Sequence, residues 1–514
     1  MARAGGRRRR ELAMLAAVLA VVGVVLGAMS VKSADTSVSV GEDVFVNPDG
    51  PIDANNSPTV ARNPTRPNNV VVAHRVDLPA FSASLQVSND GGRGWQTTAL
   101  PLPPDKDRPF AADVAFAPDG TLYVSYVNLQ GTGNRPDNLW VSRSDDGGRS
   151  MSAPVRVAGA LSFQARIAVD KQSVLHITWL RVADVAPYAI VGYPSPVVAS
   201  RSSDGGKTFS EPVEVSDPDR MLLAGPSPAV DSDGNLVVLY QDYKNDNRDF
   251  RNLEGPVYED PVALVVTVSK DGGQTFSKGV EVNADLVLTR RFLVFLPEFP
   301  SLAAGPRRSL YVSWGDGRNG DLDVFVSRSG DGGATWGEPV RVNTNRVEDG
   351  TDQYMPRVAV APNGRVDVVF YDRSRDPSNV VQDAYLGVST DDGASFVNEQ
   401  VSSASFDSRV GFSANPKLEA DLGSRLGLTS TDQEAFAVWT DTRLGTEDTA
   451  RQDIAATAVT IREKKGSGTG PLAVALLVAS FLCLLGWWLS GGKKADSSAP
   501  AGRGAGPDTR SVDE

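Results

Sequence analysis

The sequence predicts an all-β fold in which similar sheets form a closed ring, a β-propeller. Two observations support this prediction: a short phrase occurs six times along the 514-residue chain, and an apolar segment of strand character precedes each copy. Similarity at a regular period is typical of repeat architectures. The 49 glycines and 33 prolines also suit a chain that is rich in turns.

Each copy of the phrase has a serine, an aspartate two residues later, a glycine two further on, then a small or hydroxyl residue and a large apolar one. Asp-Gly and Gly-Gly supply the positive φ of a tight turn, and the aspartate can accept hydrogen bonds from backbone amides across it. We therefore predict a hairpin turn between the third and fourth strands of each sheet. Its structural aspartates are Asp90, Asp146, Asp204, Asp271, Asp331 and Asp391.

The phrase resembles the Asp box, or bacterial neuraminidase repeat, of the sialidase superfamily. The resemblance covers residues 40 to 461 and implies a propeller. In that superfamily the box serves folding and carries no catalysis. The sialidases have six blades, and the count for this chain differs.

A second repeated feature, an apolar strand that ends in an aromatic residue, gives the number of blades. A seventh strand, residues 434–439, has no phrase after it, and residues 41–47 read like residues 337–343, the outermost strand of a middle repeat. An N-terminal strand that completes the last sheet would close the ring and protect a sheet edge. We therefore predict seven blades, with six blades plus a terminal appendage as the alternative. The other six register strands end in an aromatic residue or its stand-in: His74, Tyr126, Trp179, Tyr240, Trp314 and Phe370.

The two ends of the chain predict export and membrane attachment. Residues 1–34, with consecutive arginines before an apolar run, read as a signal peptide or N-terminal anchor. The propeller, residues 35–461, is then extracytoplasmic. Residues 462–470 form a linker, residues 471–490 a transmembrane helix, and residues 491–514 a disordered cytoplasmic tail. The composition is that of a bacterial surface protein, so the expected location is the cell membrane.

Composition also excludes several kinds of partner. The net charge of −12 argues against nucleic acid. Cys483 is the only cysteine, so no intrachain disulfide can form, and with two histidines a histidine-rich metal centre is not expected. We predict no metal and no cofactor.

Ligand sites are expected on the face opposite the predicted turns, near the axis. Thirteen residues before the register aromatic, successive blades have Asp113, Arg166, Ser227, Ser301 and Arg357. Arginine forks suit anionic groups, so Arg166 and Arg357 are candidates for a clamp. The alternative is that these are ordinary residues at the start of strands, paired with loops.

The longest loops are expected on the same face, where binding sites are usually built. They contribute Tyr258 and Glu259, then Arg290, Arg291 and Glu298, and finally Tyr354. Solvated loops without a ligand are the alternative.

The family resemblance implies a further test of function. A sialidase needs three arginines on the sugar carboxylate, a tyrosine nucleophile activated by a glutamate, and an aspartate as acid or base. Weak candidates for the last three are Tyr258 or Tyr354, Glu259 or Glu298, and Asp113, but no spacing selects them. An Arg-Ile-Pro motif is also missing, because the nearest phrases are Arg166-Ile-Ala168 and Arg357-Val-Ala359.

Three functions therefore remain open. The first is a membrane-anchored propeller that binds a surface glycan or protein partner. The second is an exo-α-sialidase-type glycoside hydrolase, and the third is an assembly factor for a membrane complex. Three arginines around one point on the axis, with a tyrosine bonded to a glutamate, favour the enzyme.

Overall fold

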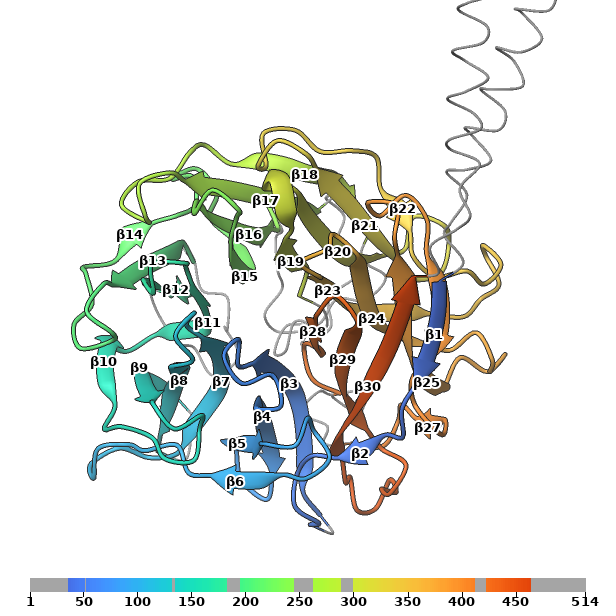
Figure 1. The fold of residues 1–514 in the computed structure, drawn as a ribbon, viewed down its shortest axis with the longest axis horizontal. Helices are drawn as coiled ribbons and strands as arrows, with labels where there is room; N and C mark the ends of the chain where they lie inside the picture. Colours follow the sequence, from blue (N-terminus) through green and yellow to red (C-terminus); the bar gives the residue numbers. More distant parts are fainter. Residues whose placement is uncertain are drawn as a thin grey trace, which may run out of the picture. The chain divides into compact units, whose positions relative to one another are not determined.

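The computed structural model describes residues 36–50, 52–131, 135–182, 195–244, 262–287, 299–411 and 422–463. In this part of the chain the strands form seven separate sheets, arranged around a central axis (Figure 1). The fold is an all-β, seven-bladed propeller. The seven-blade prediction is confirmed and the six-blade alternative is wrong.

Blades one to four are four-stranded antiparallel sheets whose strands follow the chain from the axis outward. Their strands are β3 (Ala54–Arg62), β4 (Val70–Leu78), β5 (Ser82–Ser88) and β6 (Gln96–Thr98); β7 (Pro109–Phe116), β8 (Leu122–Gln130), β9 (Arg135–Ser144) and β10 (Val155–Ala158); β11 (Ser162–Val169), β12 (Leu175–Arg181), β13 (Val197–Ser202) and β14 (Val213–Glu214); and β15 (Leu223–Val230), β16 (Leu236–Asp242), β17 (Val262–Ser269) and β18 (Val280–Leu286).

Blades five and six follow the same order, with a 3-10 helix η1 (Pro306–Arg308) in blade five and an extra strand β27 paired to β25 in blade six. Blade seven combines strands from both ends of the described chain. The strands are β19 (Ser301–Ala304), β20 (Leu310–Asp316), β21 (Asp323–Ser329) and β22 (Val340–Arg341); β23 (Gln353–Val360), β24 (Val366–Asp372), β25 (Val381–Ser389), β26 (Val397–Gln400) and β27 (Phe406–Asp407); and β28 (Gly427–Ser430), β29 (Glu434–Asp441), β30 (Asp453–Glu463), β1 (Thr36–Val40) and β2 (Val44–Phe45).

The ring closes where β1 and β2 pair with β30 (Figure 1). In β2, Val44 pairs with Ala456, and just beyond it the Val46 N–H donates to the Ile454 carbonyl at 2.7 Å. Asn47 Oδ1 accepts the Ile454 N–H at 2.6 Å. The predicted closing segment, residues 41–47, therefore lies in the expected sheet. The structure adds β1 to it, so the outer edge of blade seven consists of two short strands instead of one.

The six repeated turns share the hydrogen bonds between their serine, aspartate and second glycine. In blade five, Ser329 Oγ donates to Asp331 Oδ1 at 2.8 Å and accepts the Gly333 N–H at 2.9 Å. Asp331 also accepts the Thr335 N–H at 3.0 Å and the Thr335 hydroxyl at 2.6 Å. Gly332 and Gly333 have φ of +77° and +92°, the region that glycine tolerates best. These bonds close the turn and hold the pKa of the Asp331 carboxyl down at about 2.

The first copy differs from the other five in one respect. Gly94 stands where the others have serine or threonine, so Asp90 receives the Gly94 N–H at 2.9 Å without a hydroxyl donor from that position. The remaining copies place a serine or threonine hydroxyl 2.6 Å from the second carboxylate oxygen. The first turn therefore lacks this hydroxyl hydrogen bond to the aspartate.

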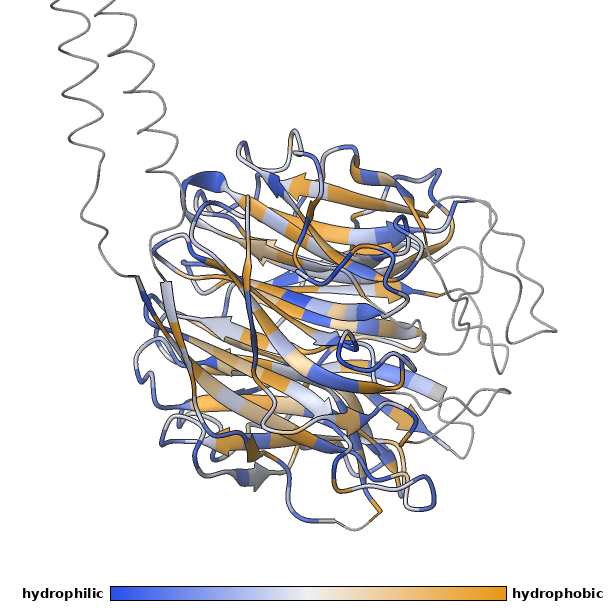
Figure 2. Ribbon diagram, turned by 90° about the vertical axis from the view of Figure 1, so that its right-hand side faces the viewer, coloured by the Kyte–Doolittle hydropathy of each residue, from blue (hydrophilic) through white to orange (hydrophobic). Residues whose placement is uncertain are grey.

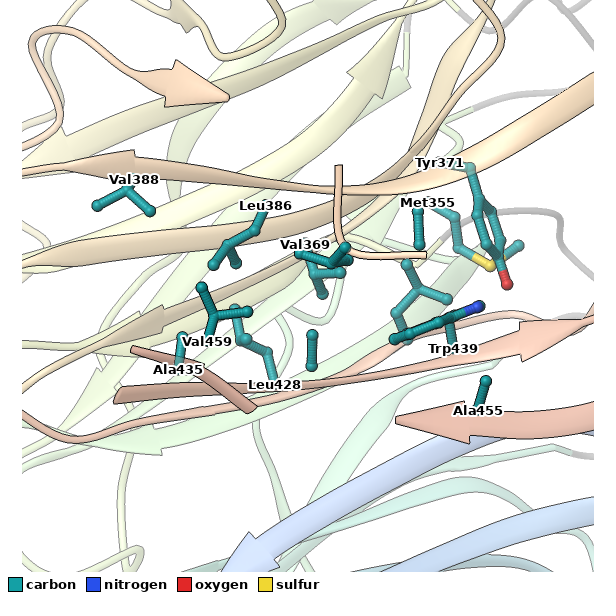
Figure 3. Close-up of a cluster of buried hydrophobic side chains, with 14 of the residues drawn as sticks. Met355, Val369, Tyr371, Leu386, Val388, Leu428, Ala435, Trp439, Ala455 and Val459 are labelled. Carbon is teal, nitrogen blue, oxygen red and sulfur yellow. The ribbon is translucent and has the colours of Figure 1, made fainter. Parts of the chain in front are cut away.

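Apolar side chains fill the spaces between neighbouring sheets. Apolar stretches run along the strands, whereas polar residues occupy many of the connecting turns (Figure 2). Between blades six and seven, Met355 and Tyr371 pack with Trp439 and Leu428 (Figure 3). The Tyr371 hydroxyl also donates to the Thr440 carbonyl at 2.8 Å. Burial of each large side chain stabilises the fold by about 1.5–3 kcal/mol, so packing joins the blades.

The turns also help to join the blades, because in five of the six the second glycine meets the second strand of the preceding blade, and Gly333 meets the third strand of blade four. A Cβ on Gly206 would lie 3.3 Å from Tyr123, and one on Gly92 would lie 2.5 Å from Phe436. The equivalent residue in blade three is His176, next to Gly273. A side chain larger than hydrogen would press the two blades apart at Gly92.

Blade seven has no repeated turn, because its outer strands come from the N-terminal part of the chain. At the place where other blades present Tyr123, His176 or Phe436 to a turn, blade six has Asp367, paired with Arg365 at 2.8 Å and fully buried with it. Arg365 also donates to the carbonyls of Thr431 and Asp432 in the β28–β29 hairpin, both at 2.9 Å. A buried ion pair thus joins blades six and seven where a turn joins the others.

The predicted segments 1–34, 471–490 and 491–514 lie outside the described residues. Of the predicted linker, residues 462–470, the first two residues belong to strand β30 and the others lie outside the described residues. The described part of the chain contains no helix suited to spanning a lipid bilayer. Signal, anchor and tail therefore stay predictions from the sequence.

Candidate functional site

The candidate site lies on the face opposite the six repeated turns. In blade three, Ser202, where the turn begins, pairs with Leu175 at the start of β12, whereas Ser162 at the start of β11 pairs with Arg181 at the other end. The turns therefore lie at one end of the propeller, the turn face, and the first strands start at the other, the pocket face. This confirms the expected separation of the two faces.

One pocket lies on this face where the first strands approach the axis. The space within and in front of it is about 270 Å³, most of it open to solvent, and the enclosed part is about the size of one water molecule. No carboxylate belongs to its lining among the residues that the structure describes. The lining consists of Arg166, Gly225, Pro226, Ser227, Phe299, Pro300, Ser301, Pro356, Arg357 and Arg425.

An irregular backbone places several of these side chains. In five blades the register of the first two strands shifts, and a residue with positive φ precedes the site position by two residues. Such bulges bend a strand and redirect its side chains. Four of the five are not glycine, so the backbone there is strained. The positive-φ residues are Ser57, Ala111, Gln164, Gly225 and Met355, and the positions they precede are Thr59, Asp113, Arg166, Ser227 and Arg357.

Three of the positions that differ between blades are used by the fold. Asp113 Oδ2 accepts the Ile167 N–H of the next blade at 3.1 Å. Ser227 accepts the Leu302 N–H at 3.4 Å, and Ser301 accepts the Val358 N–H at 3.2 Å. For these residues the alternative interpretation holds, because each joins its blade to the next.

Arg166 has no such task. The next blade presents Pro228 at the equivalent place, and proline has no N–H to donate. Among the described residues, the recorded hydrogen bond of the Arg166 guanidinium goes to the carbonyl of its neighbour Ala165 at 3.1 Å. The guanidinium lies 5.9 Å from the centre of the Phe299 ring, within cation–π range.

Arg357 and Arg425 complete the cluster. Arg357 is partly buried, and in the described part of the chain no hydrogen bond or ion pair of its guanidinium is recorded. Arg425, which is 7% exposed, donates from Nη2 to the Ala112 carbonyl at 2.9 Å, so a residue of blade seven reaches blade two. Its Nε is buried without a partner. These arginines retain unused donors.

The electrostatics of the cluster follow from burial and like charge. Burial lowers the pKa of Arg166 to about 10, with Asp113 opposing and Arg357 adding to the shift. Burial and the charge of Arg166 hold the pKa of Arg425 well below its usual value. Burial also lowers the pKa of Arg357. Desolvated guanidinium groups near one another favour an anion between them.

Arg425 is a site residue that the sequence prediction missed. Counting thirteen residues back from Trp439 ends at Leu426. By strand pairing the position equivalent to Arg166 and Arg357 is Gly427, so Arg425 lies two residues before the repeat position. The two predicted arginines, Arg166 and Arg357, do line one pocket with it.

Among the described residues, Tyr354 is bonded to a glutamine and an arginine and not to the glutamate expected of a sialidase. Its hydroxyl donates to Gln382 Oε1 and accepts from Arg373 Nη2 at 3.0 Å. Arg373 also lies 4.7 Å from the centre of the Tyr354 ring and pairs with Asp352. Within the described residues this tyrosine is held by a glutamine and an arginine.

The remaining candidates, Tyr258, Glu259, Arg290, Arg291 and Glu298, lie outside the described residues. Among the residues that are described, no group of three or more histidine, cysteine, aspartate or glutamate side chains is placed to hold a metal.

Comparisons with known proteins find only remote likenesses among solved structures. No protein-family model and no curated protein matches the chain. A protein of unknown function from Dyadobacter fermentans is 12% identical, with a TM-score of 0.47 and coverage of 83% of this chain and 99% of that one. A Hadza microbial sialidase is 16% identical, with a TM-score of 0.43 over 77% of this chain and 74% of its own. An α-L-arabinanase from Penicillium chrysogenum is 14% identical, with a TM-score of 0.39 over 70% and 95%. These likenesses do not enter the assignment of a ligand.

Proposed function

We propose that this chain is an exported, membrane-anchored propeller whose pocket face binds a carboxylate-bearing ligand of the cell surface, foremost an acidic glycan. The observation that carries the proposal is the pocket lined by Arg166, Arg357 and Arg425 without a carboxylate among its described lining residues. Export through residues 1–34 and anchoring through residues 471–490 are part of the proposal and rest on the sequence.

The chemistry of the pocket supports an acidic sugar. Guanidinium groups bind carboxylates through two parallel hydrogen bonds, and such charge-assisted bonds are stronger than neutral ones. The lining also contains the apolar residues Phe299, Pro226, Pro300 and Pro356, and the Phe299 ring lies against the Arg166 guanidinium. Apolar lining beside a few convergent polar groups is the usual form of a small-molecule site. A sugar that carries a carboxylate offers a partner to each kind of lining.

A second candidate is an exo-α-sialidase-type glycoside hydrolase. The three arginines of the pocket favour it, because they meet the arginine half of the criterion set by the sequence. The tyrosine–glutamate half is not met by Tyr354 and its described partners. No observation in the described residues favours the third prediction, an assembly factor for a membrane complex.

The test compares two glycans that differ in one group. Full-length protein is applied to an immobilised sialylated glycan and to the same glycan after reduction of its carboxylates to alcohols. We expect retention on the first and little on the second. Equal retention on both contradicts the proposal. A fluorogenic sialoside assay on the same preparation separates the two candidates, since turnover supports the hydrolase and retention without turnover supports binding.

A further inference from the structure

The arginine cluster carries more positive charge than its neighbours in the described part of the chain compensate. The described pocket lining contains Arg166, Arg357 and Arg425 and no acidic residue, although the whole chain has a net charge of −12. Within the ranges that the structure describes, Asp113 is the carboxylate that acts on all three. Three cations and one anion leave an excess of two positive charges among these residues.

The neighbouring ion pair does not reduce this excess. Arg75 also acts on Arg425, and it is paired with Asp77 at 2.8 Å, both residues being buried. This pair adds no net charge to the cluster. The charge of Asp113 is shared as well, because its Oδ2 accepts the backbone N–H of Ile167.

The guanidinium N–H donors of the cluster also outnumber their hydrogen-bond acceptors among the described residues. A guanidinium carries several N–H donors in a planar fork. Arg166 and Arg425 are each 7% exposed, and each has one recorded acceptor in the described chain, a backbone carbonyl. Arg425 Nε is a buried donor that lacks a partner. A buried charge that is not paired destabilises a fold strongly, so an anion that meets these donors would stabilise it.

We propose that the pocket holds an exchangeable small inorganic anion, with chloride as the probe, which neutralises the guanidinium groups when no acidic ligand is bound. The inference deepens the proposed function, because it uses the same pocket and makes the inorganic anion a competitor of the carboxylate. Acidic-ligand affinity then falls as chloride rises, by more than charge screening alone explains.

The primary measurement is the ³⁵Cl NMR line width of a sodium chloride solution without protein and with full-length protein. The wild type and each variant are measured separately at equal concentration. Exchange of chloride at the pocket broadens the line. We expect at least a several-fold loss of this excess broadening in Arg166→Met and in Arg425→Met. Arg149→Met is the matched control, because Arg149 is an exposed arginine on the turn face.

Thermal melting gives a second readout that does not depend on one variant's behaviour. Chloride is expected to raise the Tm of the wild type and of Arg149→Met, and to raise it much less in the two pocket variants. Equal broadening and equal Tm shifts in all four proteins overturn the inference, because they show a general salt effect.

The two proposals fail in different ways. Chloride binding that needs Arg166 and Arg425, without retention on the sialylated glycan, supports the anion site and removes the proposed function. Retention on the glycan without arginine-dependent chloride binding does the reverse.

Discussion

The turn face and the pocket face of this propeller use the repeat in opposite ways. On the turn face, six turns repeat the same serine–aspartate–glycine hydrogen bonds. On the pocket face, equivalent positions hold different residues, including Asp113, Arg166 and Ser227. Residues that recur in every blade stabilise the blade. For residues that differ between blades, the contacts show whether the fold uses them.

The contacts separate the differing residues into two groups. Asp113, Ser227 and Ser301 accept an N–H from the next blade, so the fold uses them. Arg166 and Arg357 do not, and both line the pocket. Departure from a repeat is therefore a weak sign of function, and departure with unused hydrogen-bonding capacity is a stronger one.

The largest expected effect tests the pocket face directly. The double change Arg166→Met and Arg357→Met removes two charged donors, each of which contributes about 1.5–3 kcal/mol to a hydrogen bond with a carboxylate. We expect retention on a sialylated glycan to fall by about 100-fold or more. The Tm should not fall, because among the described residues neither guanidinium has a hydrogen bond to another blade, and the loss of buried like charges offsets the lost contact of Arg166 with Phe299. A large fall in Tm would instead assign the arginines to the fold.

The next effect concerns Asp367, a residue that differs from its equivalents in other blades and that the fold uses in an ion pair. Arg365→Met leaves Asp367 buried without its ion-pair partner, which should lower the free energy of unfolding by about 3–5 kcal/mol, measured by urea denaturation. The matched control is Arg365→Met with Asp367→Val, since blade four has Val237 at the equivalent place. We expect the double variant to regain most of the loss. A double variant as unstable as the single one would show that the ion pair is not the cause.

A third effect concerns His74, which replaces the register aromatic in blade one. Burial lowers the pKa of His74 to about 4, from about 6.5 in an unfolded chain. Because its pKa is lowered by folding, His74 binds a proton more readily in the unfolded chain. The free energy of unfolding is therefore highest above pH about 6.5 and falls as the pH is lowered towards about 4. Linkage gives a loss of up to about 3 kcal/mol over this window.

His74→Phe should remove this loss, because blade six has Phe370 at the same register. The measurement is the free energy of unfolding at pH 8 and at pH 5 for both proteins. The same pH dependence in wild type and variant would show that His74 does not titrate on unfolding.

The smallest effect belongs to the turn face. Asp331→Ala removes hydrogen bonds to Thr335 and Ser329 in an exposed turn, with an expected loss of about 1–2 kcal/mol in the free energy of unfolding. Asp90→Ala is the internal control and should lose less, because Gly94 supplies no hydroxyl. Retention on the glycan should not change in either variant. A variant that melts normally and yet loses retention would assign the turn to the ligand.

The blade count was predictable from the sequence, because the turn phrase and the register aromatics are local signals. The closing strand was predictable too, since residues 41–47 repeat the pattern of residues 337–343. The division into two faces followed from strand order. Two of the three pocket arginines, Arg166 and Arg357, were found by their departure from the repeat.

The rest depended on contacts between distant parts of the chain. Arg425 meets the Ala112 carbonyl across 313 residues, and no local pattern marks it. The positive-φ residues of the bulges include Ser57, Gln164 and Met355, which have none of glycine's preference for that region. The role of Asp113 as an acceptor for Ile167 likewise appears only when blades two and three are side by side.

The most direct test of the account is a crystal structure of the protein with a bound acidic sugar such as glucuronate. We expect the carboxylate to lie within hydrogen-bonding distance of the guanidinium groups of Arg166, Arg357 and Arg425, and the sugar ring to lie against Phe299. A sugar bound elsewhere on the propeller, with the three arginines bonded to protein atoms alone, would contradict it.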